Sequence, residues 1–235
     1  MRKVISLIIA LLIFASLYDY LRSVPIDEWR EFLIGRYYLF QGEKDKAEKE
    51  FALALRKYPQ QSEIATQIAT IYMQMERWDK AEEVLKSAIK NKPSFVAYFL
   101  LGHCQLENGE RREAEKSFEK AVEMAPSNPY ALNALAYLWV EENKRLEEAV
   151  VLLRRAVRKK PLVPEIWDSL GWAYVKLGEV KKGLRLLRRA VEMIPDNWEV
   201  RYHLSVAYNK LGDTASAKVE EEKARILFAN EQERK

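Results

Sequence analysis

The feature that most constrains this sequence is a regular series of prolines. Six of its eight prolines follow one another at spacings of 34, 34, 33, 35 and 34 residues. A fixed period of this length indicates a repeat protein, in which each repeat packs mainly on its neighbours. We therefore expect a solenoid of stacked units rather than a domain with one central core. The prolines are Pro25, Pro59, Pro93, Pro126, Pro161 and Pro195.

Small residues recur in register with these prolines, and large apolar residues alternate with them. Small side chains allow two helices to approach closely, and large ones fill the space between helices, so both kinds are predicted to be core. The pattern predicts two short amphipathic helices per period. The three sets are Ala47, Ala81, Ala114, Ala149, Gly183, Ala217, then Ala54, Ala88, Ala121, Ala156, Ala190, Ala224, and then Gly35, Ala69, Gly102, Ala136, Gly171, Ser205.

These positions together resemble the tetratricopeptide repeat, a helix–turn–helix unit of about 34 residues. The most complete copy runs from Pro164 to Pro195 and turns at Gly178. The resemblance covers six repeats over residues 28–224, and it is closest to membrane-anchored members from bacterial envelopes. It implies an all-α fold, a right-handed superhelical solenoid.

Three positions depart from the repeat pattern. Gln105 stands where Tyr is usual, and the fourth repeat has one extra residue in its turn, within 142–145. Glu221 replaces a large apolar residue in the last repeat, as expected where nothing packs on the outer face. Residues 225–235 are predicted to be a capping extension that folds back through Ile226, Leu227 and Phe228.

The first 21 residues are predicted to enter a membrane. Arg2 and Lys3 precede an apolar run from Val4 to Tyr18, which as a helix spans about 22 Å. That length suits a cleaved signal peptide better than a span of about 30 Å. However, no A-x-A cleavage site is present, and Leu21 can extend the span. We favour an uncleaved transmembrane anchor over residues 4–21, with a cleaved signal and a buried soluble helix as alternatives.

The charges around this segment predict its orientation. Positive residues precede the apolar run, so by the positive-inside rule the repeats face the periplasm or the cell exterior of a single-pass inner-membrane protein. Residues 22–27 form a short linker that holds the first repeat near the bilayer. This repeat contains five aromatic residues, which either cap the solenoid or contact headgroups or a membrane partner. They are Trp29, Phe32, Tyr37, Tyr38 and Phe40.

A basic stretch lies in the fourth and fifth repeats. From Lys144 to Arg189 there are thirteen Lys and Arg residues and five Asp and Glu residues, a net charge of +8 (13 − 5), whereas the whole chain carries +4. Arg154 and Arg155 recur one period later as Arg188 and Arg189, which predicts a basic ridge along the second helices. The ridge is either a solvated helix face or a docking patch for an acidic partner or anionic lipid.

We find no catalytic, metal-binding or cofactor-binding motif in the sequence. His103 and His203 have no ligand partner at suitable spacing, and Cys104, the single cysteine, is interpreted as a buried, inert thiol. No Gly-rich phosphate loop or nucleophile elbow is present. The sequence therefore predicts a non-enzymatic protein without cofactor or metal, and it does not indicate nucleic-acid binding.

The resemblance implies a binding groove, because the first helix of each tetratricopeptide repeat lines a concave surface that holds a peptide or partner helix. Among these positions, Phe99, Tyr137, Trp172 and Tyr202 are expected to form an exposed aromatic strip. The family's carboxylate clamp for chaperone tails is excluded, because Phe32, Gln67 and Val96 occupy three of its positions. The expected groove residues are Phe32, Arg36, Thr66, Thr70, Phe99, His103, Asn133, Tyr137, Asp168, Trp172, Tyr202 and Val206.

The sequence thus predicts a membrane-anchored scaffold that binds another protein and assists assembly of an envelope or membrane complex. The alternative is a stoichiometric accessory subunit of a large membrane complex, held there by its anchor helix.

Overall fold

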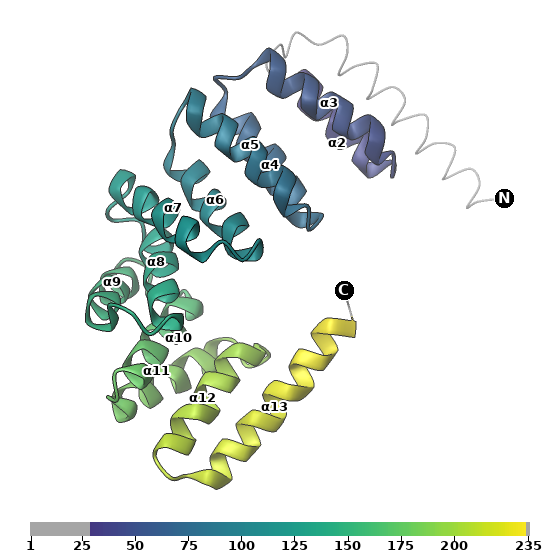
Figure 1. Cartoon of the computed structure of the whole chain (residues 1–235). Coiled ribbons are helices and arrows are strands. Elements are labelled where there is room, and N and C mark those ends of the chain that lie inside the picture. The colour runs from purple at the N-terminus through teal and green to yellow at the C-terminus, as the bar shows by residue number, and fades with distance from the viewer. Residues whose placement is uncertain (1–28, 234–235) are drawn as a thin grey trace, which may run out of the picture. The chain divides into compact units, whose positions relative to one another are not determined.

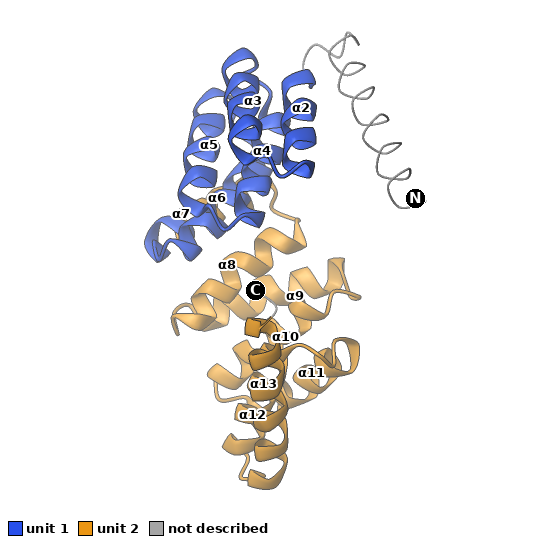
Figure 2. Cartoon of the chain, turned by 90° about the vertical axis from the view of Figure 1, so that its right-hand side faces the viewer, with its two compact units in different colours: residues 1–114 blue, residues 115–235 orange. Residues whose placement is uncertain are grey.

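The computed structural model describes residues 29–233, which form twelve α-helices and no strand (Figure 1). The chain divides into two compact units at Ala114 (Figure 2), and each is described by itself. The predicted anchor, 1–21, and linker, 22–27, lie outside the described residues. The helices are α2 (Arg30–Phe40), α3 (Lys44–Lys57), α4 (Ser62–Gln74), α5 (Trp78–Asn91), α6 (Phe95–Glu107), α7 (Arg111–Met124), α8 (Pro129–Glu141), α9 (Leu146–Lys159), α10 (Pro164–Lys176), α11 (Val180–Met193), α12 (Trp198–Lys210) and α13 (Thr214–Glu233).

The helices within each unit form the predicted helix–turn–helix hairpins. Unit 1 contains the hairpins α2–α3 and α4–α5, then α6 and the first turn of α7. Unit 2 contains the rest of α7 and the hairpins α8–α9, α10–α11 and α12–α13. Three residues join the two helices of a period everywhere in the described chain except between α8 and α9, where residues 142–145 make the connector four residues long. The extra residue predicted in the fourth repeat is therefore located in this turn.

Helix starts between repeats are set by short polar caps. The side chain of Asn128 accepts hydrogen bonds from the backbone N–H groups of Tyr130 and Ala131 at 2.9 and 3.2 Å. Pro129 takes the first helical position of α8, where its missing N–H costs nothing. Asn197 caps α12 in the same way, through the N–H of Val200 at 3.0 Å. The recurring prolines Pro126 and Pro195 lie two residues before these caps, in the connectors between repeats.

The small residues of the repeat are core, as predicted, and two glycines mark the tightest helix contact. A Cβ atom added at Gly171 of α10 would lie 2.8 Å from Cγ of Leu187, and one at Gly183 of α11 would lie 2.6 Å from the carbonyl oxygen of Gly171. The helices α10 and α11 can pack this closely only because neither residue has a side chain. All members of the three small-residue sets are buried, which confirms the predicted register.

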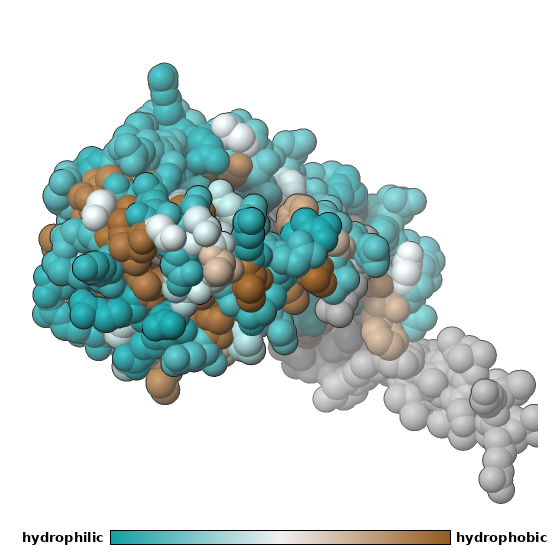
Figure 3. Space-filling model, turned by 90° about the horizontal axis from the view of Figure 1, so that it is seen from below, coloured by the Kyte–Doolittle hydropathy of each residue, from teal (hydrophilic) through white to brown (hydrophobic). Residues whose placement is uncertain are grey.

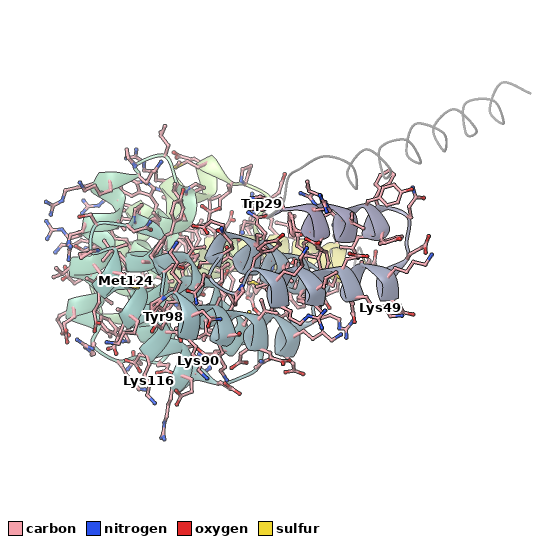
Figure 4. The ribbon with its side chains drawn as sticks, turned by 90° about the horizontal axis from the view of Figure 1, so that it is seen from above. Trp29, Lys49, Lys90, Tyr98, Lys116 and Met124 are labelled. Carbon is pink, nitrogen blue, oxygen red and sulfur yellow. The ribbon has the colours of Figure 1, made fainter. Side chains whose placement is uncertain are left out.

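The aromatic residues of the first repeat divide between core and surface. Trp29 lies at the start of α2 (Figure 4) and meets the ring of Phe32 edge-on at 5.4 Å. Phe32 is only 3% exposed and packs against Phe51, so its predicted place in the groove is wrong: the side chain fills the core of unit 1. Phe40 is 69% exposed.

Cys104 is fully buried in α6 and has no disulfide partner within the described chain. Burial raises the pKa of its thiol to about 12, and the nearby Glu82 adds to the shift. A thiol with so high a pKa stays protonated and is a poor nucleophile, in agreement with the prediction of an inert cysteine.

The end of the chain differs from its prediction. The helix α13 continues without a break to Glu233 instead of folding back after Ala224. Phe228 meets the ring of Trp198 edge-on at 5.0 Å, whereas Ile226 is 48% exposed. The segment stays helical, and Phe228 is the one of its three apolar residues that is seen stacking on α12. Glu221 is exposed, as expected of an outer face.

Hydrophilic residues dominate the face of the molecule shown in Figure 3, with hydrophobic residues interspersed among them. Within residues 29–233, no helix is both long and apolar enough to span a bilayer.

Candidate protein-binding site

Each first helix of unit 2 presents an aromatic ring and a carboxylate one turn apart. The pairs are Tyr137 with Glu141 in α8, Asp168 with Trp172 in α10, and Glu199 with His203 in α12. The paired positions recur every 31 residues, with the ring first in α8 and the carboxylate first in α10 and α12. Side chains four residues apart share one face of a helix. We call these six residues the first-helix cluster.

Hydrogen bonds join the first-helix cluster across all three helices. Tyr137 donates its hydroxyl hydrogen to Glu199, and Trp172 Nε1 donates to Glu141 Oε1 at 2.7 Å. His203 Nδ1 lies 3.0 Å from both carboxylate oxygens of Asp168, and its ring stacks on Trp172 with centroids 4.3 Å apart. These contacts fix the side chains of three consecutive repeats relative to one another.

The first-helix cluster is rich in negative charge. Glu141, Asp168 and Glu199 receive their hydrogen bonds from a tryptophan, a histidine and a tyrosine rather than from Lys or Arg. Burial raises the pKa of Tyr137, and the bond to Glu199 raises it further, so this hydroxyl stays protonated as a donor. One lysine, Lys176, lies over the Trp172 ring at 4.9 Å. The carboxylates therefore outnumber the cations here.

An additional acceptor lies one turn before Tyr137. Asn133 Oδ1 is buried and accepts no hydrogen bond within the described chain. A buried carbonyl oxygen without a donor is costly, and such groups are rare in folded proteins. Together with the carboxylates, it makes this face of α8, α10 and α12 one that favours a partner supplying donors and positive charge.

The aromatic strip predicted from the sequence is only partly exposed. Tyr202 is 48% exposed, but Trp172 is 7% exposed because His203 covers one face of its ring. Asp168 is also buried, by the same histidine. Trp172 and Asp168 thus lie beneath the surface, where they hold His203 in place, and they are not open to a partner. Phe99 belongs to unit 1 and the other three to unit 2, so no strip is described across them.

The predicted groove residues of unit 1 have varied environments. Arg36 is exposed, whereas Thr66 is buried and donates to the backbone carbonyl of Glu63. Thr70 donates to the carbonyl of Thr66. Phe99 and His103 meet edge-on at 4.7 Å, and burial lowers the pKa of His103.

The four arginines of the predicted basic ridge are exposed, and three of them contact neighbouring elements. Arg155 donates to the carbonyl of Pro126 at 2.7 Å, and Arg188 to the hydroxyl of Tyr208 at 3.0 Å. The guanidinium of Arg189 lies 4.0 Å from the centroid of the Trp167 ring. Such stacking and bonding stabilise the repeat contacts, so the ridge has a structural use of its own. The fourth arginine of the basic ridge is Arg154, which is also exposed.

The sequence interpretation missed Glu141, Glu199 and His203 as members of one site. Their signal is the 31-residue recurrence, which is shorter than the repeat period and was hidden by it. Residues 31 apart lie on successive first helices, and they meet diagonally rather than at equivalent repeat positions. Only the packing of α8, α10 and α12 shows that these residues are in contact.

Comparisons with known proteins agree with the fold. The chain is 30% identical to the protein CTR9 homolog of Arabidopsis thaliana over 146 residues, 59% of this chain and 13% of that protein. It spans between 13% and 20% of the length of the curated relatives that it matches.

Two solved structures show the same fold. The anaphase-promoting hetero-tetramer Cut9–Hcn1 aligns with a TM-score of 0.72 and 19% identity, over 93% of this chain and 43% of that one. YrrB, described as a tetratricopeptide-repeat protein with an unusual peptide-binding site, aligns with a TM-score of 0.58 and 19% identity, over 75% and 91% of the two chains.

A family profile covers nearly all of the described residues. The profile of the cilia and flagella-associated protein 70 C-terminal domain, a tetratricopeptide-repeat domain, matches residues 27–235. The period, the helical hairpins and this match agree, and the chain belongs to the tetratricopeptide-repeat family of the cilia and flagella-associated protein 70 C-terminal domain.

Proposed function

We propose that this protein is a membrane-attached scaffold whose first-helix cluster binds a partner protein through a segment that carries Lys or Arg. Tetratricopeptide repeats build extended surfaces for protein–protein contact. The observation behind this proposal is the set of three carboxylates on α8, α10 and α12, bonded to tyrosine, tryptophan and histidine side chains rather than to Lys or Arg. A basic side chain would neutralise Glu141 and Glu199, because Asp168 is buried beneath His203.

The membrane part of this proposal is supported by the apolar run over residues 4–21, outside the described residues. A single-pass inner-membrane protein with its repeats in the periplasm or at the cell exterior would hold the first-helix cluster near envelope proteins. Assistance in assembling an envelope or membrane complex fits such a location, and no catalytic role is proposed.

An accessory subunit of a large membrane complex is the second candidate. It is favoured by the likeness to Cut9, which is solved as part of a hetero-tetramer. A pull-down with the full chain in detergent, followed by mass spectrometry, separates the two candidates. A fixed-ratio complex supports the subunit, and several clients below stoichiometric amounts support the assembly scaffold.

The charge variant Glu199→Gln tests the binding surface. Glutamine keeps an oxygen that can accept the Tyr137 hydroxyl but removes the charge, so the fold should persist. We expect the affinity for the partner from the pull-down to fall about tenfold, together with a weaker salt dependence. The matched control is Glu192→Gln, an exposed residue of α11 outside the first-helix cluster.

Equal affinities of the partner for wild type, Glu199→Gln and Glu192→Gln would show that the first-helix cluster is not part of the binding surface. A loss for Arg154→Gln alone would instead move the function to the basic ridge.

A further inference from the structure

We propose that unit 2 has a second docking site, a groove between α7 and α9 that accepts a bulky apolar side chain of a partner segment bearing a basic residue beside it. The groove encloses 510 Å³, within the range of about 300–1,000 Å³ typical of ligand pockets. Its apolar lining is Val122 of α7, Leu135 and Trp139 of α8, and Val151 and Leu152 of α9. No residue of the first-helix cluster lines it.

Val151 is apolar at a position that does not require an apolar residue. It stands two residues after the small residue Ala149, and the equivalent positions in four of the other five repeats are charged: Lys49, Glu83, Lys116 and Arg185. Lys49 and Lys116 lie at the outer margin of the ribbons in Figure 4, as solvated residues should. Val151 is 57% exposed at the mouth of the groove. Val219 is the other exposed valine at this repeat position, and Val151 differs from it in lying at the mouth of a groove.

The irregular connector 142–145 supplies one wall of the groove. Asn143 has a φ angle of 55°, as is usual at this turn position, where Glu76 and Gly178 also have positive φ. Arg145, by contrast, has a φ angle of 47° at a position without a counterpart in the other turns, in the left-handed region that residues other than glycine rarely adopt. Strained backbone of this kind is concentrated at functional sites. Here it directs the Arg145 guanidinium over the Trp139 ring, at 3.9 Å from the centroid.

Contacts from three helices hold Arg145 in this position. Its Nε donates to Glu148 Oε1 at 2.8 Å, and its Nη2 donates to the other oxygen of the same carboxylate. Glu119 of α7 lies 3.5 Å from Nη1. Trp139 is in turn fixed by the bond from its Nε1 to Glu115 at 2.7 Å. The wall and floor of the groove are therefore preformed, which lowers the entropic cost of binding.

The charges of the lining select the partner. Glu119, Glu123 and Glu148 line the groove with a single cation, Arg145. Arg145 is bonded to Glu148 through two nitrogens and also lies near Glu119. Glu123 pairs with the exposed Lys120, a pair that contributes little. Glu123 is therefore the carboxylate of α7 that we expect to receive a Lys or Arg next to the inserted apolar side chain.

Panning of random peptides displayed on phage against the full chain in detergent tests this proposal. The variant Val151→Glu blocks the mouth, and Val219→Glu is its matched control, because Val219 occupies the same repeat position in α13, is 54% exposed and does not line the groove. We expect wild type and Val219→Glu to select peptides in which an apolar residue neighbours Lys or Arg. These peptides should bind Val151→Glu about tenfold more weakly or not at all.

Two further measurements keep the test decisive. Thermal unfolding checks that each variant is folded. If Val151→Glu is not, Glu123→Lys replaces it and should weaken the same peptides. The proposal is overturned if wild type selects no such peptides, if the selected peptides are acidic, if the folded Val151→Glu binds them as wild type does, or if Glu199→Gln abolishes their binding, because the last result assigns them to the first-helix cluster.

Discussion

At the scale of single residues, the two histidines of the first helices have different environments. His203 is 3% exposed, bonds to Asp168 and stacks on Trp172. His103 contacts the edge of Phe99, and burial lowers its pKa. The sequence presents both as lone histidines on first helices. They occupy different positions of the repeat, because His103 directly follows the small residue Gly102 whereas His203 lies two residues before the small residue Ser205.

The lowered pKa of His103 predicts a pH dependence of stability. In the pH range just below the ordinary histidine pKa of about 6.5, the His103 imidazole takes up a proton more readily in the unfolded chain than in the folded one. The free energy of unfolding therefore falls as the pH falls through that range. We expect His103→Gln to lose less stability than wild type between about pH 7.5 and about pH 5.5.

Urea unfolding at both pH values measures this difference, and a pair of measurements at about pH 7.5 and about pH 8.5 is the control, because His103 is neutral at both. A variant that loses as much stability as wild type on acidification would show that His103 does not contribute to the pH dependence.

At the scale of helices, the contact between α10 and α11 is made at two glycines, Gly171 and Gly183. Gly183 occupies the position held by alanine in the other five repeats, and a Cβ atom there would meet the carbonyl oxygen of Gly171 at 2.6 Å. The repeat pattern alone would treat glycine and alanine at this position as equivalent. The spacing of these two helices makes them different.

Gly183→Ala should therefore destabilise the protein, although it restores the residue typical of the repeat. Overpacking of a close backbone contact costs about 1–3 kcal/mol, and the better helix propensity of alanine offsets up to about 1 kcal/mol of this. Chemical denaturation gives the free energy of unfolding. Lys181→Ala, at an exposed position of the same helix, serves as control and should change it by less than about 0.5 kcal/mol. A stabilised Gly183→Ala variant would mean that α10 and α11 can separate at little cost.

At the scale of the whole molecule, we propose that residues 4–21 attach the protein to a membrane. We expect the full chain, with its N-terminus at Met1, to remain in the membrane fraction after an alkaline wash, because the apolar run has no cleavage site. A variant that begins at Arg22 should be released by the same wash. Fractionation and N-terminal mapping check both forms. A mature N-terminus between residues 15 and 24 would indicate a cleaved signal peptide instead of an anchor.

The sequence by itself determined the repeat, its register and its core. Prolines, capping residues and small residues act locally, within one helix or between two helices adjacent in the chain, so a period of about 34 residues specifies them without knowledge of distant contacts. The burial of Ala121 and of the other small residues, and the inert Cys104, followed from this local code.

Only the tertiary structure decided which side chains meet across repeats. Tyr137 and Glu199 are 62 residues apart, and Trp172 lies beneath His203 although its repeat position is variable in the family. Likewise, one extra residue in a turn placed Arg145 over Trp139. Such contacts depend on the angle and spacing between neighbouring helices, to which many residues each contribute a little. These contacts therefore cannot be predicted from any single position in the sequence.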